Sequence, residues 1–101
     1  PDPDPDPTVV TTQSVNVSVT TRGRNSRASA DVVVSAGGVQ VDGCFSGAVS
    51  VCDSATADAS GAVTFDSGKY RASGSVTFCV SNITGTNVTF QAGASDCGTS
   101  P

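Results

Sequence analysis

Apolar residues, mostly valine, recur at every second position in short segments of this chain, and turn-forming residues separate the segments. Residues 14–20, for example, read SVNVSVT and place Val15, Val17 and Val19 on one side of an extended chain. Because side chains alternate between the two faces of a β-strand, each segment predicts a strand with one buried face. Seven such segments fall within about 90 residues, which is typical of an antiparallel sandwich. The side chains expected in the core are Val15, Val17, Val19, Ala28, Ala30, Val32, Val34, Val39, Val41, Phe45, Val49, Val51, Val63, Phe65, Val76, Phe78, Val80, Val88 and Phe90.

The composition also favours strands over helices. Leu, Glu, Met, Trp and His are all absent, so most of the strong helix formers are missing. Val, Thr, Ser and Gly make up just over half of the chain. Val and Thr suit a pleated, half-buried surface, whereas Gly and Ser suit turns. The 101 residues are enough for one domain with one core, and its expected class is all-β.

The first seven residues, PDPDPDP, differ from the rest of the chain. Alternating prolines and like charges predict an extended, self-repelling spacer, so we place a Pro/Asp linker at residues 1–7 and the folded domain at residues 8–101. Such a spacer usually separates a folded unit from a neighbour, and we therefore expect the chain to be part of a longer protein. Beyond the linker, six Asp face five Lys and Arg. This near balance argues against nucleic acid or a membrane as a partner.

Three short stretches rich in Gly, Ser, Asp and Arg predict turns between strands. RGRNSR at 22–27 should be the first turn, AGG at 36–38 the second, and DASG at 58–61 a tight turn. A further turn, SGAV at 46–49, should separate two strands that each carry a cysteine.

The four cysteines predict two disulfides. Cys44 and Cys52 flank the SGAV turn with outward parity, and Cys79 lies between two core positions, so it also points outward. Cys97 lies in the tail, where a bond to Cys79 would hold the last segment against a strand. Among three connectivities we predict 44–52 with 79–97. A zinc site would need CxxC or His, and a thioredoxin-type pair would need CxxC beside a helix, and the chain has none of these. Disulfides indicate an extracellular or periplasmic protein, and we expect a secreted, extracellular one.

The sequence offers little material for catalysis. Without His there is no imidazole general base and no Ser-His-Asp or Cys-His triad. Without Glu, carboxylates outside the linker come only from Asp, and no DxDxDG calcium loop occurs. We therefore expect no enzyme activity, no cofactor and no metal. The Asp residues concerned are Asp31, Asp42, Asp53, Asp58, Asp66 and Asp96.

Two features are candidates for binding. Arg22, Arg24 and Arg27 cluster in one predicted turn, which is either a contact site for an acidic polymer or partner domain, or a solvated turn paired with nearby Asp. Tyr70 is the single Tyr, and the chain has no Trp. Because all four Phe have core parity, binding of carbohydrate by a platform of exposed aromatic rings is disfavoured.

Three stretches together resemble a known type of domain. RGRNSRASADVVVSAGG at 22–38, GCFSGAVSVCDSATADASGAVTF at 43–65 and SGKYRASGSVTFCVSNITGTNVTF at 67–90 resemble the immunoglobulin-like accessory domains at the C-termini of secreted bacterial proteases and other exoenzymes. The chain departs from that pattern at Ser26, where many such domains have a large aromatic residue, and in a shorter turn at 36–38. The resemblance implies an immunoglobulin-like antiparallel β-sandwich of about seven strands, stapled by disulfides.

The resemblance also implies a role. We expect a non-catalytic accessory module of a secreted bacterial enzyme, a protease, that acts as a spacer, a stabiliser or a weak attachment domain. Its partner would be an extracellular polymer, either protein or polysaccharide, or the catalytic domain of the parent enzyme. Two alternatives stay open, namely a repeat unit of an extracellular adhesin or filament, and a carbohydrate-binding module.

Overall fold

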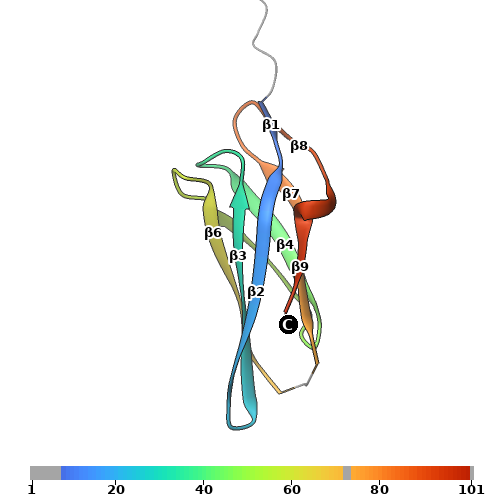
Figure 1. Cartoon of the computed structure of the whole chain (residues 1–101). Coiled ribbons are helices and arrows are strands. Elements are labelled where there is room, and N and C mark those ends of the chain that lie inside the picture. The colour runs from blue at the N-terminus through green and yellow to red at the C-terminus, as the bar shows by residue number, and fades with distance from the viewer. Residues whose placement is uncertain (1–7, 72–73, 101) are drawn as a thin grey trace, which may run out of the picture.

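The computed structural model describes residues 8–71 and 74–100, and about two thirds of these residues lie in β-strands (Figure 1). The predicted all-β class is confirmed, and the two sheets that dominate the fold are antiparallel. The predicted linker at residues 1–7 lies outside the described residues. The strands are β1 (Thr8–Val10), β2 (Thr12–Arg22), β3 (Asn25–Val34), β4 (Gln40–Gly47), β5 (Val51–Thr56), β6 (Ala62–Tyr70), β7 (Val76–Thr84), β8 (Val88–Phe90) and β9 (Cys97–Thr99), with a 3-10 turn, η1 (Ala94–Asp96), before β9.

The expected count of about seven strands is wrong, because nine strands form within the described residues. The seven predicted segments correspond to β2 through β8. The two additional strands, β1 and β9, have three residues each. A strand of three residues is too short to show a period of two, so each is defined by its partner instead. β1 pairs in parallel with β8, and β9 pairs with β7.

The strands form a sandwich of two antiparallel sheets with a small parallel pair at one end (Figure 1). One sheet has the order β2-β3-β6, and the other has the order β5-β4-β7-β9. The parallel pair β1-β8 lies at the upper end of the view, whereas the turn between β2 and β3 lies at the lower end. The chain therefore enters the sandwich at the end opposite to the β2–β3 turn.

Three phenylalanines from both sheets form the centre of the core. The ring of Phe65, on β6, stacks on that of Phe78, on β7, with 4.7 Å between centroids. Phe45, on β4, meets Phe78 edge to face at 4.8 Å. All three side chains are almost fully buried, as the alternation predicts. Aromatic pairs of this geometry add about 0.5–1.5 kcal/mol each to the effect of burial alone, so this cluster joins the two sheets.

The predicted core is confirmed in β3, β4, β6 and β7, is only half-buried at Val15, Val19, Val88 and Phe90, and is wrong at one sheet edge. The alternating residues of β3, β4, β6 and β7 are buried as expected. Val51 was expected to point inward, but it is 37% exposed. Val51 lies opposite Phe45 and so shares its face, but it is the first residue of an edge strand, where little else covers it. Val49 lies in the loop before β5 and is half-buried, because this strand begins later than the sequence suggests.

The turns predicted at 22–27, 36–38 and 58–61 form, and the first is tighter than expected. Arg22 and Asn25 are already paired across the hairpin, so the turn reduces to Gly23 and Arg24, with Gly23 at φ +62°. The turn predicted at 46–49 lies later, at 48–50, because Ser46 and Gly47 still belong to β4 and pair with β7. In the turn at 58–61, Asp58 Oδ1 accepts hydrogen bonds from the hydroxyl and the backbone N–H of Ser60. A further bond comes from the backbone N–H of Ala62, and these bonds together lower the pKa of Asp58 from its usual value.

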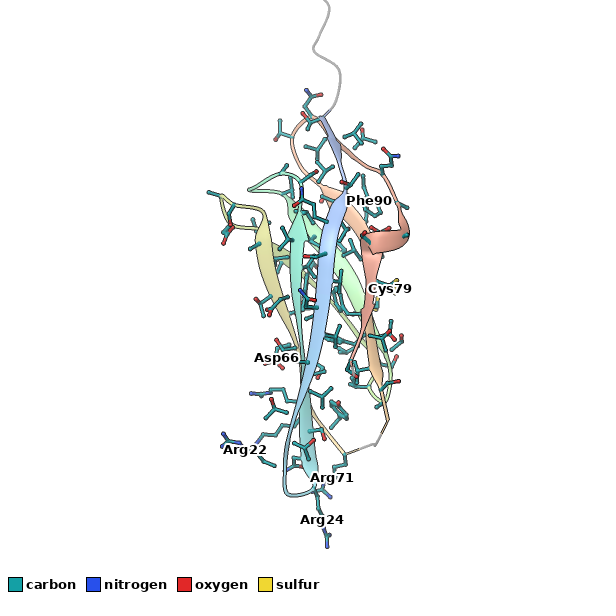
Figure 2. The ribbon with its side chains drawn as sticks, in the orientation of Figure 1. Arg22, Arg24, Asp66, Arg71, Cys79 and Phe90 are labelled. Carbon is teal, nitrogen blue, oxygen red and sulfur yellow. A yellow bond between two sulfur atoms is a disulfide. The ribbon has the colours of Figure 1, made fainter. Side chains whose placement is uncertain are left out.

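The four cysteines form one row across the four-stranded sheet. Cys52 on β5, Cys44 on β4, Cys79 on β7 and Cys97 on β9 are successive partners in the sheet register. Disulfides join Cys44 to Cys52 and Cys79 to Cys97, as predicted. All four residues are exposed or half-buried, which confirms their outward parity (Cys79 is labelled in Figure 2).

The register explains why neighbours in this row pair as they do. Opposite residues on antiparallel strands alternate between a wider, hydrogen-bonded pair and a closer pair without such bonds, at about 5.5 and 4.5 Å between Cα atoms. The Cα separations are 3.9 Å for Cys44–Cys52 and 4.0 Å for Cys79–Cys97, so both disulfides join close pairs. Because the N–H and C=O of a strand residue point toward the same neighbouring strand, Cys44 and Cys79 form a pair of the wider type. This geometry disfavours a bond between these two central cysteines.

We predict that the two disulfides contribute similar stability. Double substitution of Cys44 and Cys52 by Ala, or of Cys79 and Cys97 by Ala, should each lower the free energy of unfolding by about 2.5–3 kcal/mol. The second variant should lose slightly more, because its bond closes a sequence separation of 18 rather than 8 residues. Denaturant unfolding measures both losses. Peptide mapping without reduction should recover these two links, and a 44–79 link would contradict the register.

The last strand depends on a glycine that lets it approach β2. At Gly98, on β9, an added Cβ would overlap the backbone carbonyl oxygen of Val15. We predict that Gly98→Ala destabilises the fold by about 1–3 kcal/mol, because the backbone of β9 would have to move away from β2. Gly93→Ala is the matched control, since a Cβ there meets nothing within 4 Å. Thermal unfolding of both variants tests this, and equal effects would show that β9 is not closely packed.

Candidate functional site

All five basic residues of the chain lie near one end of the sandwich, where the β2–β3 hairpin meets the end of β6. Figure 2 shows Arg22, Arg24 and Arg71 at the lower end of the view, away from the end where β1 begins. We call this group the cationic tip. Its members are Arg22 at the end of β2, Arg24 in the turn, Arg27 on β3, Lys69 on β6 and Arg71 directly after β6.

The sequence predicted three of these five residues. Arg22, Arg24 and Arg27 lie on one hairpin, and all three are exposed. Lys69 and Arg71 were missed, because they lie more than 40 residues further along the chain. Pairing of β3 with β6 places Lys69 directly opposite Arg27. For Lys69 and Arg71 the sequence offers only the small total of basic residues, and this total does not say where a residue lies in the fold.

A shallow hollow of about 420 Å³ lies among five exposed polar side chains near the tip. Thr20 and Lys69 are the register partners of Arg27 on its two sides, and Arg22 is the partner of Asn25. Thr20, Arg22, Asn25 and Arg27 alternate with the core-facing residues of β2 and β3, so the hollow lies on the solvent face of the three-stranded sheet. Lys69 has the parity of the buried residues of β6, but the register shift between β3 and β6 brings it opposite Arg27, and it is exposed. We call it the outer hollow. It combines three cations with one hydroxyl and one amide.

One of the three cations in the outer hollow has an acidic partner. Arg27 Nε lies 3.2 Å from Asp66 Oδ1, and both side chains are about half exposed. Asp66 Oδ1 also accepts a hydrogen bond from the backbone N–H of Gly68 at 2.8 Å. Among the described residues this is the single salt bridge, so Arg22 and Lys69 have no carboxylate within 4 Å there. Of the three hairpin arginines, Arg27 is therefore paired with Asp, whereas Arg22 and Arg24 form no salt bridge within the described residues.

Tyr70 lies in a second hollow of about 330 Å³, which we call the inner hollow. Arg24 and Arg71 are among its lining residues. The tyrosine ring is half-buried and packs against the core, so it is not an open stacking platform. Its hydroxyl is buried and has no hydrogen-bond partner among the described residues. Tyr70, the fourth candidate from the sequence, is thus close to the cationic tip but separate from the outer hollow.

The carboxylates outside the linker are spread over the rest of the sandwich, apart from Asp66. Asp96 is the most buried, and its Oδ2 accepts a hydrogen bond from the backbone N–H of Gly93 at 2.7 Å. Within the described residues, no three His, Cys, Asp or Glu side chains come together in an arrangement that could hold a metal ion. The strongest concentration of charge in the folded part is therefore the cationic tip.

Comparison with known proteins identifies no relative of this chain, so the description of the site rests on its geometry. No protein-family model, no curated protein and no solved structure matches this chain. The two disulfides are consistent with an extracellular protein. No helix in the described part of the chain is long and apolar enough to cross a membrane.

We predict that the tip arginines contribute little to folding. Arg22→Ala and Arg24→Ala should each change the free energy of unfolding by less than about 0.5 kcal/mol, because both side chains are exposed. Arg27→Ala should cost less than about 1 kcal/mol, as expected for an exposed ion pair. Denaturant unfolding provides the measurement. A loss above about 2 kcal/mol for any of them would show a structural role instead.

Proposed function

We propose that this chain is a non-catalytic, immunoglobulin-like accessory module of a secreted bacterial enzyme, with a protease as the parent that the sequence resemblance implies. In this proposal the module attaches the enzyme weakly to an extracellular polymer and keeps it at a distance from the attachment point. The two-sheet antiparallel sandwich and its two disulfides support a robust extracellular domain of this kind.

One observation carries the attachment role, namely that the cationic tip and the start of the fold lie at opposite ends of the sandwich (Figures 1 and 2). β1 begins at Thr8, directly after the Pro/Asp linker. An enzyme joined through that linker would therefore leave the tip facing away from it. A domain that served only as a spacer would not need all five basic residues of the chain at one end.

The chemistry of the tip favours polar and ionic binding over stacking. Phe45, Phe65 and Phe78 are buried, and Tyr70 packs against the core. Exposed ion pairs contribute about 0.2–1 kcal/mol each, so a few such contacts give weak attachment. Weak attachment suits an enzyme that must move along its substrate or surface.

Pull-down on insoluble extracellular polymers tests the proposal, with cellulose, chitin, collagen and cross-linked polygalacturonate as the panel. We expect binding to at least one polymer, and we expect it to be lost in an Arg22→Ala, Arg24→Ala, Arg27→Ala variant and at high salt. Because the arginines are exposed, this variant should stay folded, and circular dichroism checks that it does.

Three results would contradict the proposal. Tight binding that survives both the triple substitution and high salt would place the contact away from the tip. Binding to no polymer in the panel would remove the attachment role. Self-association into long assemblies would favour the alternative of an adhesin or filament repeat.

A further inference from the structure

We propose that the outer hollow, formed by Thr20, Arg22, Asn25, Arg27 and Lys69, binds a linear acidic glycan, in which carboxylate or phosphate groups recur along the polymer. This inference rests on the proposed attachment function and names the chemical class of its partner.

The spacing of the cations favours a polymer over a single small anion. Arg22 and Lys69 are on strands separated by β3, so their backbones are about 10 Å apart across the sheet. The hollow therefore presents its three cations on three neighbouring strands, with Arg27 between the other two. Successive charged groups of a polymer could contact them together. The hydroxyl of Thr20 and the amide of Asn25 add neutral hydrogen-bonding groups beside the cations.

The distribution of charge over the chain would orient such a polymer. Every Lys and Arg is in the cationic tip, whereas five of the six Asp in the described part of the chain lie outside the outer hollow and its rim. An acidic glycan is therefore attracted to the tip and repelled by the rest of the surface. This arrangement favours end-on contact, with the N-terminal end of the fold directed away from the polymer.

The lining of the outer hollow also favours a glycan over a folded protein partner. Protein interfaces are usually centred on buried aromatic or apolar anchors. The five lining residues are all polar or charged and all exposed. They suit the hydroxyl and acidic groups of a hydrated polymer.

Removal of the negative charge of Asp66 should strengthen binding of an acidic glycan. The Asp66 carboxylate holds Arg27 at the rim and places one negative charge beside the hollow. Asp66→Asn keeps an oxygen that can accept the hydrogen bond from the N–H of Gly68 while it removes the charge. Binding of an acidic glycan should therefore become about two- to three-fold tighter in this variant, within the range of one exposed charge pair.

The experiment measures binding of the full chain to soluble polygalacturonate, to a polyol phosphate and to an uncharged glucan, at about 0.05 M salt, where charge screening is weak. We expect binding to a charged polymer and none to the glucan. The carboxylate and phosphate arms show which acidic group is preferred. A monomer of the preferred polymer should bind at least about ten-fold more weakly than an oligomer, because an oligomer can place several acidic groups on the hollow at once.

A matched pair of variants locates the site. Arg22→Ala with Lys69→Ala removes two charges from the outer hollow, and we expect a roughly ten-fold loss of affinity. Arg24→Ala with Arg71→Ala removes two charges from the inner hollow of the same tip, and we expect less than about a three-fold loss. Adding Asp31→Asn and Asp53→Asn to the first variant restores its net charge. Affinity should stay low there, because the site is local.

Several outcomes would overturn the inference. A larger loss in the Arg24 and Arg71 variant would move the site to the inner hollow, and recovery after the two Asp→Asn changes would show that net charge alone matters. Single-stranded DNA binding more tightly than either acidic polymer would indicate a different class of partner. Tip-dependent binding to cellulose, chitin or collagen without acidic-glycan binding would refute this inference and leave the proposed function standing. Absence of binding to every polymer would refute both.

Discussion

Stacking of Phe65 on Phe78 is the contact on which the rest of the fold depends, because it joins the two sheets at the centre of the sandwich. The chain has no Leu, Met or Trp, so the core consists mainly of Val and Ala around three buried Phe rings. Small side chains bury little area each, and a domain of this size is only marginally stabilised by its core. Two further features add to the stability of the fold. They are the close packing of β9 against β2 at Gly98 and the two disulfides.

Both disulfides lie in one sheet, and the cationic tip lies on the other. Cys44, Cys52, Cys79 and Cys97 cross-link the outer face of β5-β4-β7-β9. The outer hollow is formed by β2, β3 and β6. Covalent stabilisation and the candidate binding surface therefore do not compete for the same positions. The three-stranded sheet can carry polar and charged side chains on its solvent face because its inner face packs on the four-stranded sheet, which the disulfides cross-link.

The sequence predicted the features that depend on local pattern. Alternation of Val with polar residues identified the core faces of β3, β4, β6 and β7, and outward parity led to the correct pairing of the four cysteines. Features that depend on pairing between distant segments could not be predicted in the same way. β1 and β9 are three-residue strands defined by their partners, and the exposure of Val51 follows from its place at an edge.

The same limit explains why the sequence revealed only part of the candidate site. The three hairpin arginines are close in sequence, whereas Lys69 joins them because β6 pairs with β3 rather than with its neighbours along the chain. A β-bulge between Arg27 and Ser29 shifts this register, and it places Lys69 rather than another residue beside Arg27. Three cations from three strands then share one face, with one carboxylate, Asp66, to offset them. Exposed unpaired charge of this kind contributes little to folding, and its concentration at the end remote from β1 is why we propose a role for it in attachment.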